Sequence, residues 1–475
     1  MSVVHCDLAV LGGGMAGLPI ANKAAYKGLR TVLVERELLG GTCLNRGCIP
    51  TKTLIESARA AHVARTAGRL GVEVTGEVRV DLAAIVRRKD EVVRSIRERA
   101  YAQVEANEHL SLVEAEARFV EPGVLQAGDT TIRAERVVVN TGARPTLPLI
   151  EGLESVPYHT SRTLLDVTDL PEHLLVVGGG YVGCEFVQTF ARFGSRVTVL
   201  QRGTHLLPSD DPDAGAVIAE VFRDEGIEVV LDAEAVRVEE RGGAIRLTVH
   251  VGNAERTFAG DALLIAAGRT PNTDTLNLDA AGVEVDERGF IVVDKAYRTS
   301  ADGVWAIGDV VGGPMYTHSA RDDADRLYRR IVKGETEDSE ADDATTSTGR
   351  HVPHAVFTDP EVAAVGLTEA EAREAGYELK VGTHPFSRVA RAKAMGQTAG
   401  FVRLVADAET DRLLGATIVG PHAGELIHEL VVALDLGATY DRIGRSLHVH
   451  PTLAEGVNSA AGGVHRPAGD EESRD

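Results

Sequence analysis

Cysteine is scarce in this chain, and the scarcity narrows the kinds of protein it can be. Its 475 residues contain four cysteines, Cys6, Cys43, Cys48 and Cys184. Small secreted domains that depend on disulfides carry many more per residue, so a disulfide scaffold is excluded. Cys43 and Cys48 lie five positions apart, and this proximity suggests a local redox or metal site.

Long apolar runs and positive charge are also lacking. No run approaches the roughly 20 apolar residues of a membrane-spanning helix, and no basic stretch precedes the first apolar segment as it does in a signal peptide. Lysine and arginine total 50 against 71 acidic residues, a net charge of −21. This balance argues against partners such as nucleic acid or an anionic membrane. We therefore expect a cytoplasmic protein with no membrane association.

The chain does contain enough hydrophobic sequence for about three domains, because 44% of its residues are hydrophobic and 25% are charged. Within it, one unit occurs twice: an apolar strand, a Gly-x-Gly-x-x-Gly turn, a helical stretch and a second strand. In both copies the first glycine precedes the residue at the end of the second strand by 23 positions. The copies comprise strand 7–11 with Gly12, Gly14, Gly17 and Glu35, and strand 174–177 with Gly178, Gly180, Gly183 and Gln201.

This repeated pattern predicts two dinucleotide-binding sites. The first glycine permits a tight turn, the second lets the backbone approach a pyrophosphate, and the third packs the helix on the strand. The N–H groups at the start of the helix are then free to bind the anion. Two ordinary glycine turns in an α/β protein are the simpler alternative, but the matched spacing in strand–turn–helix context argues against it.

Other segments complete the expected architecture. Residues 81–106 have helical apolar spacing, and the arginines among them are expected to form a solvated face. Residues 335–349 are acidic and rich in serine and threonine, which is typical of a linker; residues 466–475 look like a tail. Further strands are expected at 136–142, 262–268 and 304–309 and near 356–366, 401–407 and 413–420, with a last helix at roughly 423–436.

The densest signal is the segment GGTCLNRGCIPTKTL at residues 40–54. Cysteines near a helix start have lowered pKa values, because unpaired N–H groups and the helix dipole favour thiolate. A zinc site would need about four ligands, and no second cysteine or histidine cluster accompanies this pair. A structural disulfide and two inert buried thiols remain as alternatives to a redox pair. Cys6 and Cys184 are expected to be packed thiols.

The residues GGTCLNRGCIPTK closely resemble the redox signature of the class I flavoprotein disulfide reductases, the family of dihydrolipoyl dehydrogenase, glutathione reductase, mycothione reductase and mercuric reductase. The resemblance extends over residues 5–460. It implies an α/β fold with two Rossmann-like dinucleotide-binding domains and a C-terminal α+β dimerisation domain. The implied boundaries are 1–150 for the first part of an FAD-binding domain, 151–272 for an NAD(P)-binding domain, 273–334 for the second, central part of the FAD-binding domain, 335–350 for the linker, 351–462 for dimerisation and 463–475 for the tail.

The resemblance also implies the cofactors, FAD together with NAD(H) or NADP(H), and no metal. Residues 308–309 and 315–318 look like the family's second FAD-binding stretch. The implied cofactor-binding residues are Gly12, Gly14, Gly17, Glu35, Gly41, Thr42, Lys52, Ala117, Thr141, Gly142, Ala143, Gly308, Asp309, Met315, Tyr316, Thr317 and His318 for FAD, with Gly178, Gly180, Gly183, Glu185, Gln201, Arg202 and Gly268 for the second nucleotide.

By the same resemblance, Cys43 is the thiol that meets the substrate and Cys48 exchanges electrons with the flavin. Lys52 follows Cys48 by one helical turn and would pair with Glu185. Taken alone, Lys52 and Glu185 would be ordinary surface charges. The histidines at 354, 384, 422, 428 and 465 have no such context and are expected mainly at the surface or in packing.

The C-terminal sequence HVHPTLAE resembles dihydrolipoyl dehydrogenase more than the other members. The resemblance makes His450 an acid–base catalyst, oriented by Glu455 and reaching the active site of the partner subunit in a homodimer. Imidazole suits this role because it titrates near neutral pH. No cysteine follows Cys184, whereas mercuric reductases usually carry a C-terminal cysteine pair.

The resemblance has departures that leave the substrate and nucleotide open. Gln201 stands where NAD-specific members place a carboxylate that repels a 2′-phosphate, and Arg202 follows it, so we expect weak discrimination between NAD and NADP. Arg46 replaces a small apolar residue. The expected reaction moves two electrons between a small dithiol or disulfide, for which a protein-bound lipoyl group is a candidate, and NAD(P). Alternatives are reduction of Hg(II), another disulfide or a quinone, and a non-catalytic redox-sensing flavoprotein.

Overall fold

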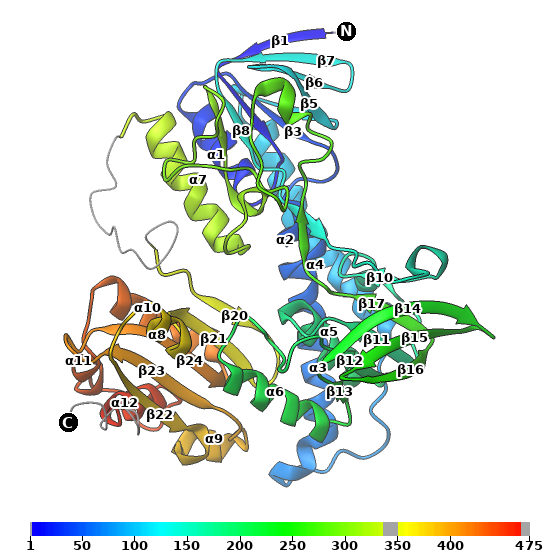
Figure 1. Cartoon of the computed structure of the whole chain (residues 1–475), viewed down its shortest axis with the longest axis vertical. Helices are drawn as coiled ribbons and strands as arrows, with labels where there is room; N and C mark the ends of the chain where they lie inside the picture. Colours follow the sequence, from blue (N-terminus) through cyan, green and yellow to red (C-terminus); the bar gives the residue numbers. More distant parts are fainter. Residues whose placement is uncertain (1, 336–349, 467–475) are drawn as a thin grey trace.

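Three packed units make up the chain in a computed structural model that describes residues 2–335 and 350–466 (Figure 1). Two are the predicted nucleotide units, and the third is an antiparallel sheet with helices. The expected acidic linker and tail lie almost wholly outside the described residues. The predicted fold class is confirmed, because each nucleotide unit is built on a parallel sheet.

The first nucleotide unit is a five-stranded parallel sheet in the order β19-β8-β2-β3-β4, beside a four-stranded sheet in the order β1-β7-β6-β5. The central strand β2 is wholly buried, as expected of a parallel strand covered on both faces. The strands are β1 Ser2–Cys6, β2 Leu8–Leu11, β3 Thr31–Glu35, β4 Leu110–Glu114, β5 Ala117–Glu121, β6 Val124–Ala127, β7 Thr130–Ala134, β8 Val137–Val139 and β19 Val304–Ala306. The helices are α1 Gly17–Tyr26, α2 Gly41–Arg46, α3 Cys48–Thr66, α4 Leu82–Glu105 and α7 Thr317–Ile331.

The second nucleotide unit repeats this order, as β10-β17-β11-β12-β13. It adds a three-stranded antiparallel sheet that the sequence did not predict. Its elements are β10 His159–Thr160, β11 His173–Val177, α5 Tyr181–Phe193, β12 Arg196–Leu200, α6 Pro212–Asp224, β13 Glu228–Val230, β14 Ala233–Arg241, β15 Ala244–Val251, β16 Ala254–Gly260 and β17 Ala262–Ile265. A short antiparallel pair, β9 Ala143–Pro145 with β18 Arg269–Pro271, connects the two units.

The equal sequence spacing of the two copies becomes an equal strand register. Leu11 pairs with Val34 in the first unit, and Val177 pairs with Leu200 in the second. Each glycine turn therefore begins beside the end of the second strand. This register brings Glu35 and Gln201 to equivalent positions next to the two turns.

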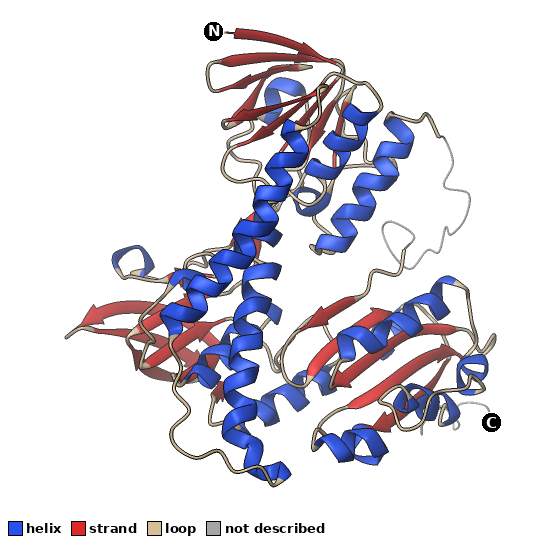
Figure 2. Ribbon diagram, turned by 180° about the vertical axis from the view of Figure 1, so that it is seen from behind, coloured by secondary structure: helices blue, strands red, loops and turns tan. Residues whose placement is uncertain are grey.

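Two long helices run from the first unit to the second (Figure 2). They are α3 and α4, and α3 packs against α5 of the second unit. The predicted helix at 81–106 is confirmed as α4, and the Asp81 carboxylate caps it by accepting from the backbone N–H of Ala84 at 2.9 Å. Not every charged residue of this helix is solvated, because Lys89 is buried and pairs with Asp166 at 2.5 Å.

The third unit is a five-stranded antiparallel sheet in the order β20-β21-β24-β23-β22. The strands predicted near 356–366, 401–407 and 413–420 contain β21, β23 and β24. The sequence predicted neither β20, which ends at Val356, nor β22, whose residues LKVGTHP lack a recognisable apolar pattern. Its elements are β20 His354–Val356, β21 Glu361–Gly366, α8 Glu369–Glu374, β22 Leu379–Pro385, α9 Ala390–Met395, β23 Phe401–Asp407, β24 Leu413–Gly420, α10 Ala423–Asp435, α11 Tyr440–Gly444 and α12 Glu455–Gly462.

A buried ion network fastens this third unit to the second nucleotide unit. The Arg192 guanidinium, only 7% exposed, donates to both oxygens of Glu225 at 3.0 and 2.6 Å and to Asp359 at 3.0 Å. Gln188 completes the connection through two hydrogen bonds to the backbone of Asp359. Every charge in the network is paired, as burial requires.

We expect the substitution Arg192→Leu to lower the free energy of unfolding by about 3 kcal/mol, because it leaves two half-buried carboxylates without their buried partner. Denaturant unfolding followed by circular dichroism measures the change. The control is Arg79→Leu, which removes an exposed pair with Glu77 and should change stability by less than about 1 kcal/mol. Equal effects of the two substitutions would contradict this interpretation.

Candidate active site

The two glycine turns have the geometry that a pyrophosphate-binding loop requires. At Gly12, φ is +101°, and a Cβ there would come within 2.3 Å of the Asn140 carbonyl oxygen; at Gly178, φ is +111°, and the same contact falls on Ala266. A Cβ on the third glycine, Gly17 or Gly183, would meet the carbonyl of the first at 1.9 Å.

The second glycine of each turn differs from the other two. A Cβ on Gly180 would meet nothing within 4 Å, and one on Gly14 would meet nothing closer than 3.5 Å. The backbone is therefore open at the one position where a phosphate must approach it. The phosphate-binding roles of these glycines stay predictions.

Each turn is also fastened by the side chain at the end of the second strand, the last residue of β3 in the first unit and the residue directly after β12 in the second. The Glu35 carboxylate accepts from the backbone N–H of Gly13 at 2.8 Å, and the Gln201 amide oxygen accepts from Gly179 at 2.9 Å. The second contact leaves the amide NH₂ of Gln201 as its remaining polar group, and that group can only donate. Arg202, next to it, is exposed.

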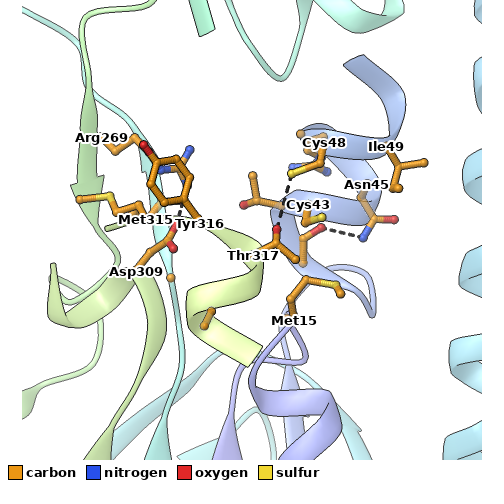
Figure 3. A pocket seen from close by; sticks show the side chains of 18 of the residues that line it. Met15, Cys43, Asn45, Cys48, Ile49, Arg269, Asp309, Met315, Tyr316 and Thr317 are labelled. Atoms are coloured by element: carbon orange, nitrogen blue, oxygen red, sulfur yellow. Dashed lines mark hydrogen bonds and ion pairs between the residues drawn. The ribbon is translucent and has the colours of Figure 1, made fainter. Parts of the chain in front are cut away.

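The two cysteines occupy the junction of two helices (Figure 3). Cys43 lies in α2, the chain turns at Gly47, and Cys48 is the first residue of α3. Its position at a helix N-terminus favours thiolate. The Cys48 Sγ lies 3.5 Å from the hydroxyl of Thr317, the first residue of α7.

The two thiols have opposite acidities, and each cysteine contributes to the acidity of the other. A hydrogen bond from Cys43 lowers the pKa of Cys48 to about 6, with further contributions from Thr317 and the Lys52 ammonium. The same bond to Cys48, together with burial, raises the pKa of Cys43 far above its usual range. In the dithiol state at neutral pH, Cys48 is therefore the thiolate and Cys43 holds the proton.

Lys52 and Glu185 form the pair that the resemblance implied. Lys52 Nζ donates to the two Glu185 oxygens at 2.7 and 2.8 Å, and the Glu185 side chain is only 5% exposed. The pair joins α3 to α5. Phe357 was not predicted at this site, yet its ring lies 4.6 Å from Lys52 Nζ and its backbone N–H donates to Glu185 at 3.0 Å.

The expected second FAD-binding stretch borders the dithiol through Thr317. Asp309 pairs with Arg269 at 3.2 Å, and burial raises the pKa of Asp309. Met315 and Tyr316 precede α7, and Thr317, the first residue of that helix, points toward the cysteines (Figure 3). Arg269, which the sequence reading missed, could have been found by its position directly after Gly268.

These groups surround one cavity of about 1030 Å³. Many of the predicted residues line it, namely Gly12, Gly14, Glu35, Gly41, Thr42, Cys43, Cys48, Lys52, Ala117, Thr141, Gly142, Ala143, Glu185, Asp309, Met315, Tyr316, Thr317 and His318. His354, His422 and His428 line it as well, so the expectation that they lie mainly at the surface or in packing missed their position at the site. The sequence could not show this, because all three come from the third unit.

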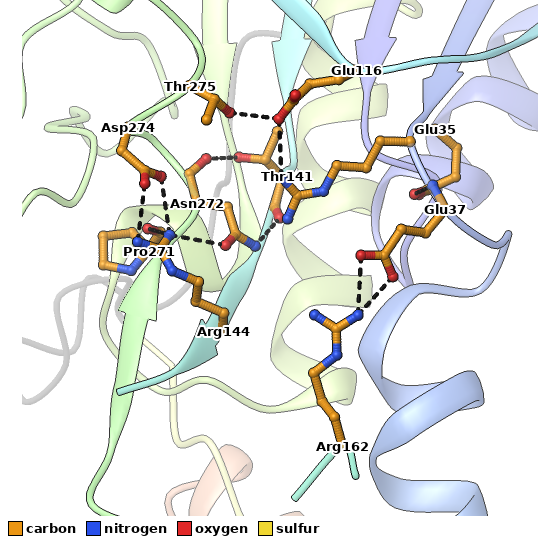
Figure 4. A network of polar contacts seen from close by, with 11 residues as sticks. Glu35, Glu37, Glu116, Thr141, Arg144, Arg162, Pro271, Asn272, Asp274 and Thr275 are labelled. Carbon is orange, nitrogen blue, oxygen red and sulfur yellow. Dashed lines mark hydrogen bonds and ion pairs between the residues drawn. The ribbon is translucent and has the colours of Figure 1, made fainter. Parts of the chain in front are cut away.

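At one end of the cavity, a polar network joins the two parts of the first nucleotide unit (Figure 4). The Glu116 carboxylate accepts from Arg36 at 3.2 Å and from the Thr275 hydroxyl at 2.8 Å. The Arg144 guanidinium donates to both oxygens of Asp274, at 3.0 and 3.1 Å. The sequence reading missed these residues because isolated charges between strands carry no motif.

Other predicted residues lie away from this cavity. Gly17 and Gly308 are buried, and the cavity lining does not include Gly178, Gly180, Gly183, Gln201, Arg202 or Gly268 of the second site. Cys6 and Cys184 are buried at 3% and 0% exposure, as expected of packed thiols. Within residues 2–335 and 350–466, no group of three or more histidine, cysteine or acidic side chains is arranged to hold a metal ion.

His450 and Glu455 form a second polar centre on the third unit. His450 Nδ1 lies 2.9 Å from the Glu455 carboxylate, whose other oxygen accepts from the Thr452 backbone N–H at 2.9 Å. These contacts lower the pKa of Glu455, the one with His450 most strongly. The His450 side chain is 72% exposed, and neither residue lines the cavity that contains the dithiol.

A dithiol between two dinucleotide-binding units is typical of proteins that exchange electron pairs between thiols and nucleotides. The chain belongs to the pyridine nucleotide-disulphide oxidoreductase family, whose model matches residues 6–324, and the dimerisation domain of that family matches residues 352–461. In the described part of the chain, no helix is both long and apolar enough to cross a membrane.

Several characterised proteins are similar over almost the whole chain. Dihydrolipoyl dehydrogenase of Thermus scotoductus is 38% identical over 467 residues, 97% of this chain and 98% of that protein. Mercuric reductase of Lysinibacillus sphaericus is 36% identical, over 96% of this chain and 82% of its own length. The structure of the HOCl-induced flavoprotein disulfide reductase RclA from Escherichia coli matches with a TM-score of 0.85 at 34% identity, covering 96% of this chain and 99% of that one.

Family membership confirms the predicted cofactors, FAD and a pyridine nucleotide, and the dimerisation domain supports a homodimer. The residues present fit FAD, because the open Gly14 backbone, the Glu35 carboxylate and the dithiol all border the same cavity. When bound, FAD supplies a reversible two-electron carrier beside the dithiol. The individual residue roles stay predictions, which the following experiments test.

We expect the Cys48 thiolate in the two-electron-reduced holoenzyme to be lost as the pH falls through about 6, because its lowered pKa places the deprotonated form above that value. The thiolate-to-flavin charge-transfer absorbance measures it. The substitution Lys52→Met removes a nearby cation and should move the midpoint to higher pH. A midpoint near the ordinary thiol value in the unmodified protein would contradict the assignment.

We expect the substitution Gln201→Glu to raise the ratio of kcat/KM for NAD over that for NADP by about tenfold or more, ~1.4 kcal/mol. The new carboxylate would repel a 2′-phosphate, whereas the present amide does not. The control Gln397→Glu makes the same exchange at an exposed position of the third unit and should leave the ratio unchanged. A strong preference for one nucleotide before any substitution would refute the expected weak discrimination.

Proposed function

We propose that this protein is a dihydrolipoyl dehydrogenase-like enzyme, which oxidises a dithiol and reduces NAD(P)⁺. The substrate dithiol loses two electrons and two protons as it closes to a disulfide, and the Cys43–Cys48 disulfide opens to a dithiol. Reoxidation passes one hydride equivalent to NAD(P)⁺ and releases one proton. Dihydrolipoamide, free or as a protein-bound lipoyl group, is the favoured substrate.

The observation that supports this proposal best is the His450–Glu455 pair. With Nδ1 held at 2.9 Å by the carboxylate, the imidazole has its Nε2 available to take a proton from a substrate thiol. A thiol needs such a base near neutral pH, because only its thiolate attacks a disulfide. A carboxylate beside the ring also stabilises the imidazolium that results.

The position of this pair in the fold argues for a shared active site. His450 is exposed and does not line the cavity of its own chain, so it can serve a dithiol only from the partner subunit. The attack would fall on Cys43, since Cys48 is the better leaving thiolate by its lower pKa. Each subunit would then supply the cysteines of one site and the base of the other.

Reduction of a thiophilic metal ion is the second candidate. Met15 and Met315 line the cavity with the two cysteines, and sulfur ligands select soft ions. The relatives include mercuric reductase, and RclA has been solved as a Cu(II) complex. No cysteine follows Cys184, whereas mercuric reductases usually carry a C-terminal cysteine pair, and we therefore place this function second.

The test is the initial rate of NAD⁺ and NADP⁺ reduction by dihydrolipoamide. We expect turnover with both nucleotides, and we expect His450→Gln to lower kcat by about 10²–10⁴ because general-base catalysis is lost. The matched control is His448→Gln, which removes a neighbouring imidazole held by Glu429 at the same 2.9 Å.

The outcomes separate the candidates. Negligible turnover with dihydrolipoamide, together with NADPH-dependent reduction of Hg(II) or Cu(II), would favour the metal-ion reductase. Negligible reduction of every acceptor would favour the non-catalytic redox sensor. An active dilute monomer would refute the shared site.

A further inference from the structure

The edge strand of the C-terminal sheet contacts both groups that stand beside Cys48. This strand, β20, spans His354–Val356, and Phe357 follows it directly. Strands at a sheet edge have one side unpaired and available for other contacts. Here His354, which begins the strand, contacts Tyr316, and Phe357, which follows the strand, contacts Lys52.

The C-terminal end of the strand contacts the Lys52–Glu185 pair. The Phe357 ring lies 4.6 Å from Lys52 Nζ, within the range of a cation–π interaction. The Phe357 backbone N–H donates to the Glu185 carboxylate at 3.0 Å. Lys52 is a long side chain that is 31% exposed, so the ring and the carboxylate together restrict where its ammonium can lie.

The N-terminal end of the strand contacts the segment that leads into α7. The His354 ring stacks on Tyr316 with centroids 5.5 Å apart and planes 1° from parallel. His354 Nε2 is held by the Asp210 carboxylate at 2.6 Å, and that carboxylate is only 6% exposed. Tyr316 in turn precedes Thr317, whose hydroxyl contacts Cys48.

His318 makes two further contacts at this end of the strand. The His318 ring also stacks on Tyr316, with centroids 5.5 Å apart, and its Nε2 donates to the Pro353 carbonyl at 2.6 Å. The His318 and His354 rings therefore stack on Tyr316, and the Asp210 carboxylate holds the second of these rings. The charged and titratable groups around Cys48 and this stack are Cys43, Lys52, Tyr181, Glu185, Asp210, His318, Arg321, Arg350, His354 and His428.

We propose that His354 and Phe357 are positioning residues for the redox centre, and that β20 holds Thr317 and the Lys52 ammonium in place beside Cys48. The proposal rests on the role of Cys48 in the proposed function. It adds that the third unit helps to stabilise the Cys48 thiolate. The Lys52 ammonium stabilises a thiolate by its charge and the Thr317 hydroxyl does so by hydrogen bonding, and both contributions weaken with distance. Releasing either neighbour would therefore make the Cys48 thiolate harder to form.

The experiment titrates the charge-transfer absorbance of the FAD-loaded enzyme after reduction with dithiothreitol, so it needs no lipoyl substrate. We expect Phe357→Leu, His354→Leu and Asp210→Asn each to move the midpoint upward by about half a pH unit or more. Phe357→Tyr keeps an aromatic ring and should restore the original midpoint. His384→Leu, at the opposite edge of the same sheet, serves as the matched control and should leave it unchanged.

The outcomes distinguish this proposal from the proposed function. Unchanged midpoints in the FAD-loaded variants would overturn the role of β20 while leaving the proposed function intact. If the charge-transfer absorbance of the unmodified enzyme titrates as expected but dihydrolipoamide is not oxidised, only the proposed substrate is refuted. Absence of the absorbance in the unmodified enzyme would refute both. Should Phe357→Leu lose FAD, the milder Asp210→Asn substitution decides, because it keeps the size of the side chain.

Discussion

The ion pair between Lys52 and Glu185 is the contact on which the arrangement of the redox centre depends. It joins the helix that begins at Cys48 to the helix that follows the second glycine turn. A buried carboxylate needs a partner, so the pair fixes how α3 and α5 pack. One core cluster continues across this junction and includes Leu54 of α3 and Phe186 of α5. The dithiol therefore has a set position relative to both nucleotide units.

This position makes the two thiols differ in acidity. Cys48 begins a helix, faces the Thr317 hydroxyl and lies near a fixed cation, whereas Cys43 lies inside a short helix and hydrogen-bonds to Cys48. Negative charge is thus favoured at one sulfur and the proton at the other. A disulfide whose leaving thiol is the more acidic one opens faster when the other sulfur is attacked. We therefore predict different tasks for two chemically identical residues.

The sequence predicted the parts of this protein that local pattern determines. The two glycine turns, the strands beside them and helix α4 all follow from spacing and apolar periodicity, and the Lys52–Glu185 pair was anticipated through family resemblance. The contacts of Phe357, His354 and Arg269 were not predicted, because they arise where separate units meet and leave no periodic signal. Strand β22 was also not predicted, because its sequence, which contains a glycine and a proline, lacks a recognisable apolar pattern. Domain boundaries and residue roles remain predictions.

The measurement that tests the account most directly is the visible spectrum of two single-cysteine variants of the oxidised holoenzyme at neutral pH. In Cys43→Ser the hydroxyl can still donate to Cys48, so the remaining thiolate should give charge-transfer absorbance with the flavin. In Cys48→Ser the remaining Cys43 thiol should keep its proton and give none. Absorbance in both variants, in neither, or only in Cys48→Ser would contradict the assignment of Cys48 as the thiolate beside the flavin.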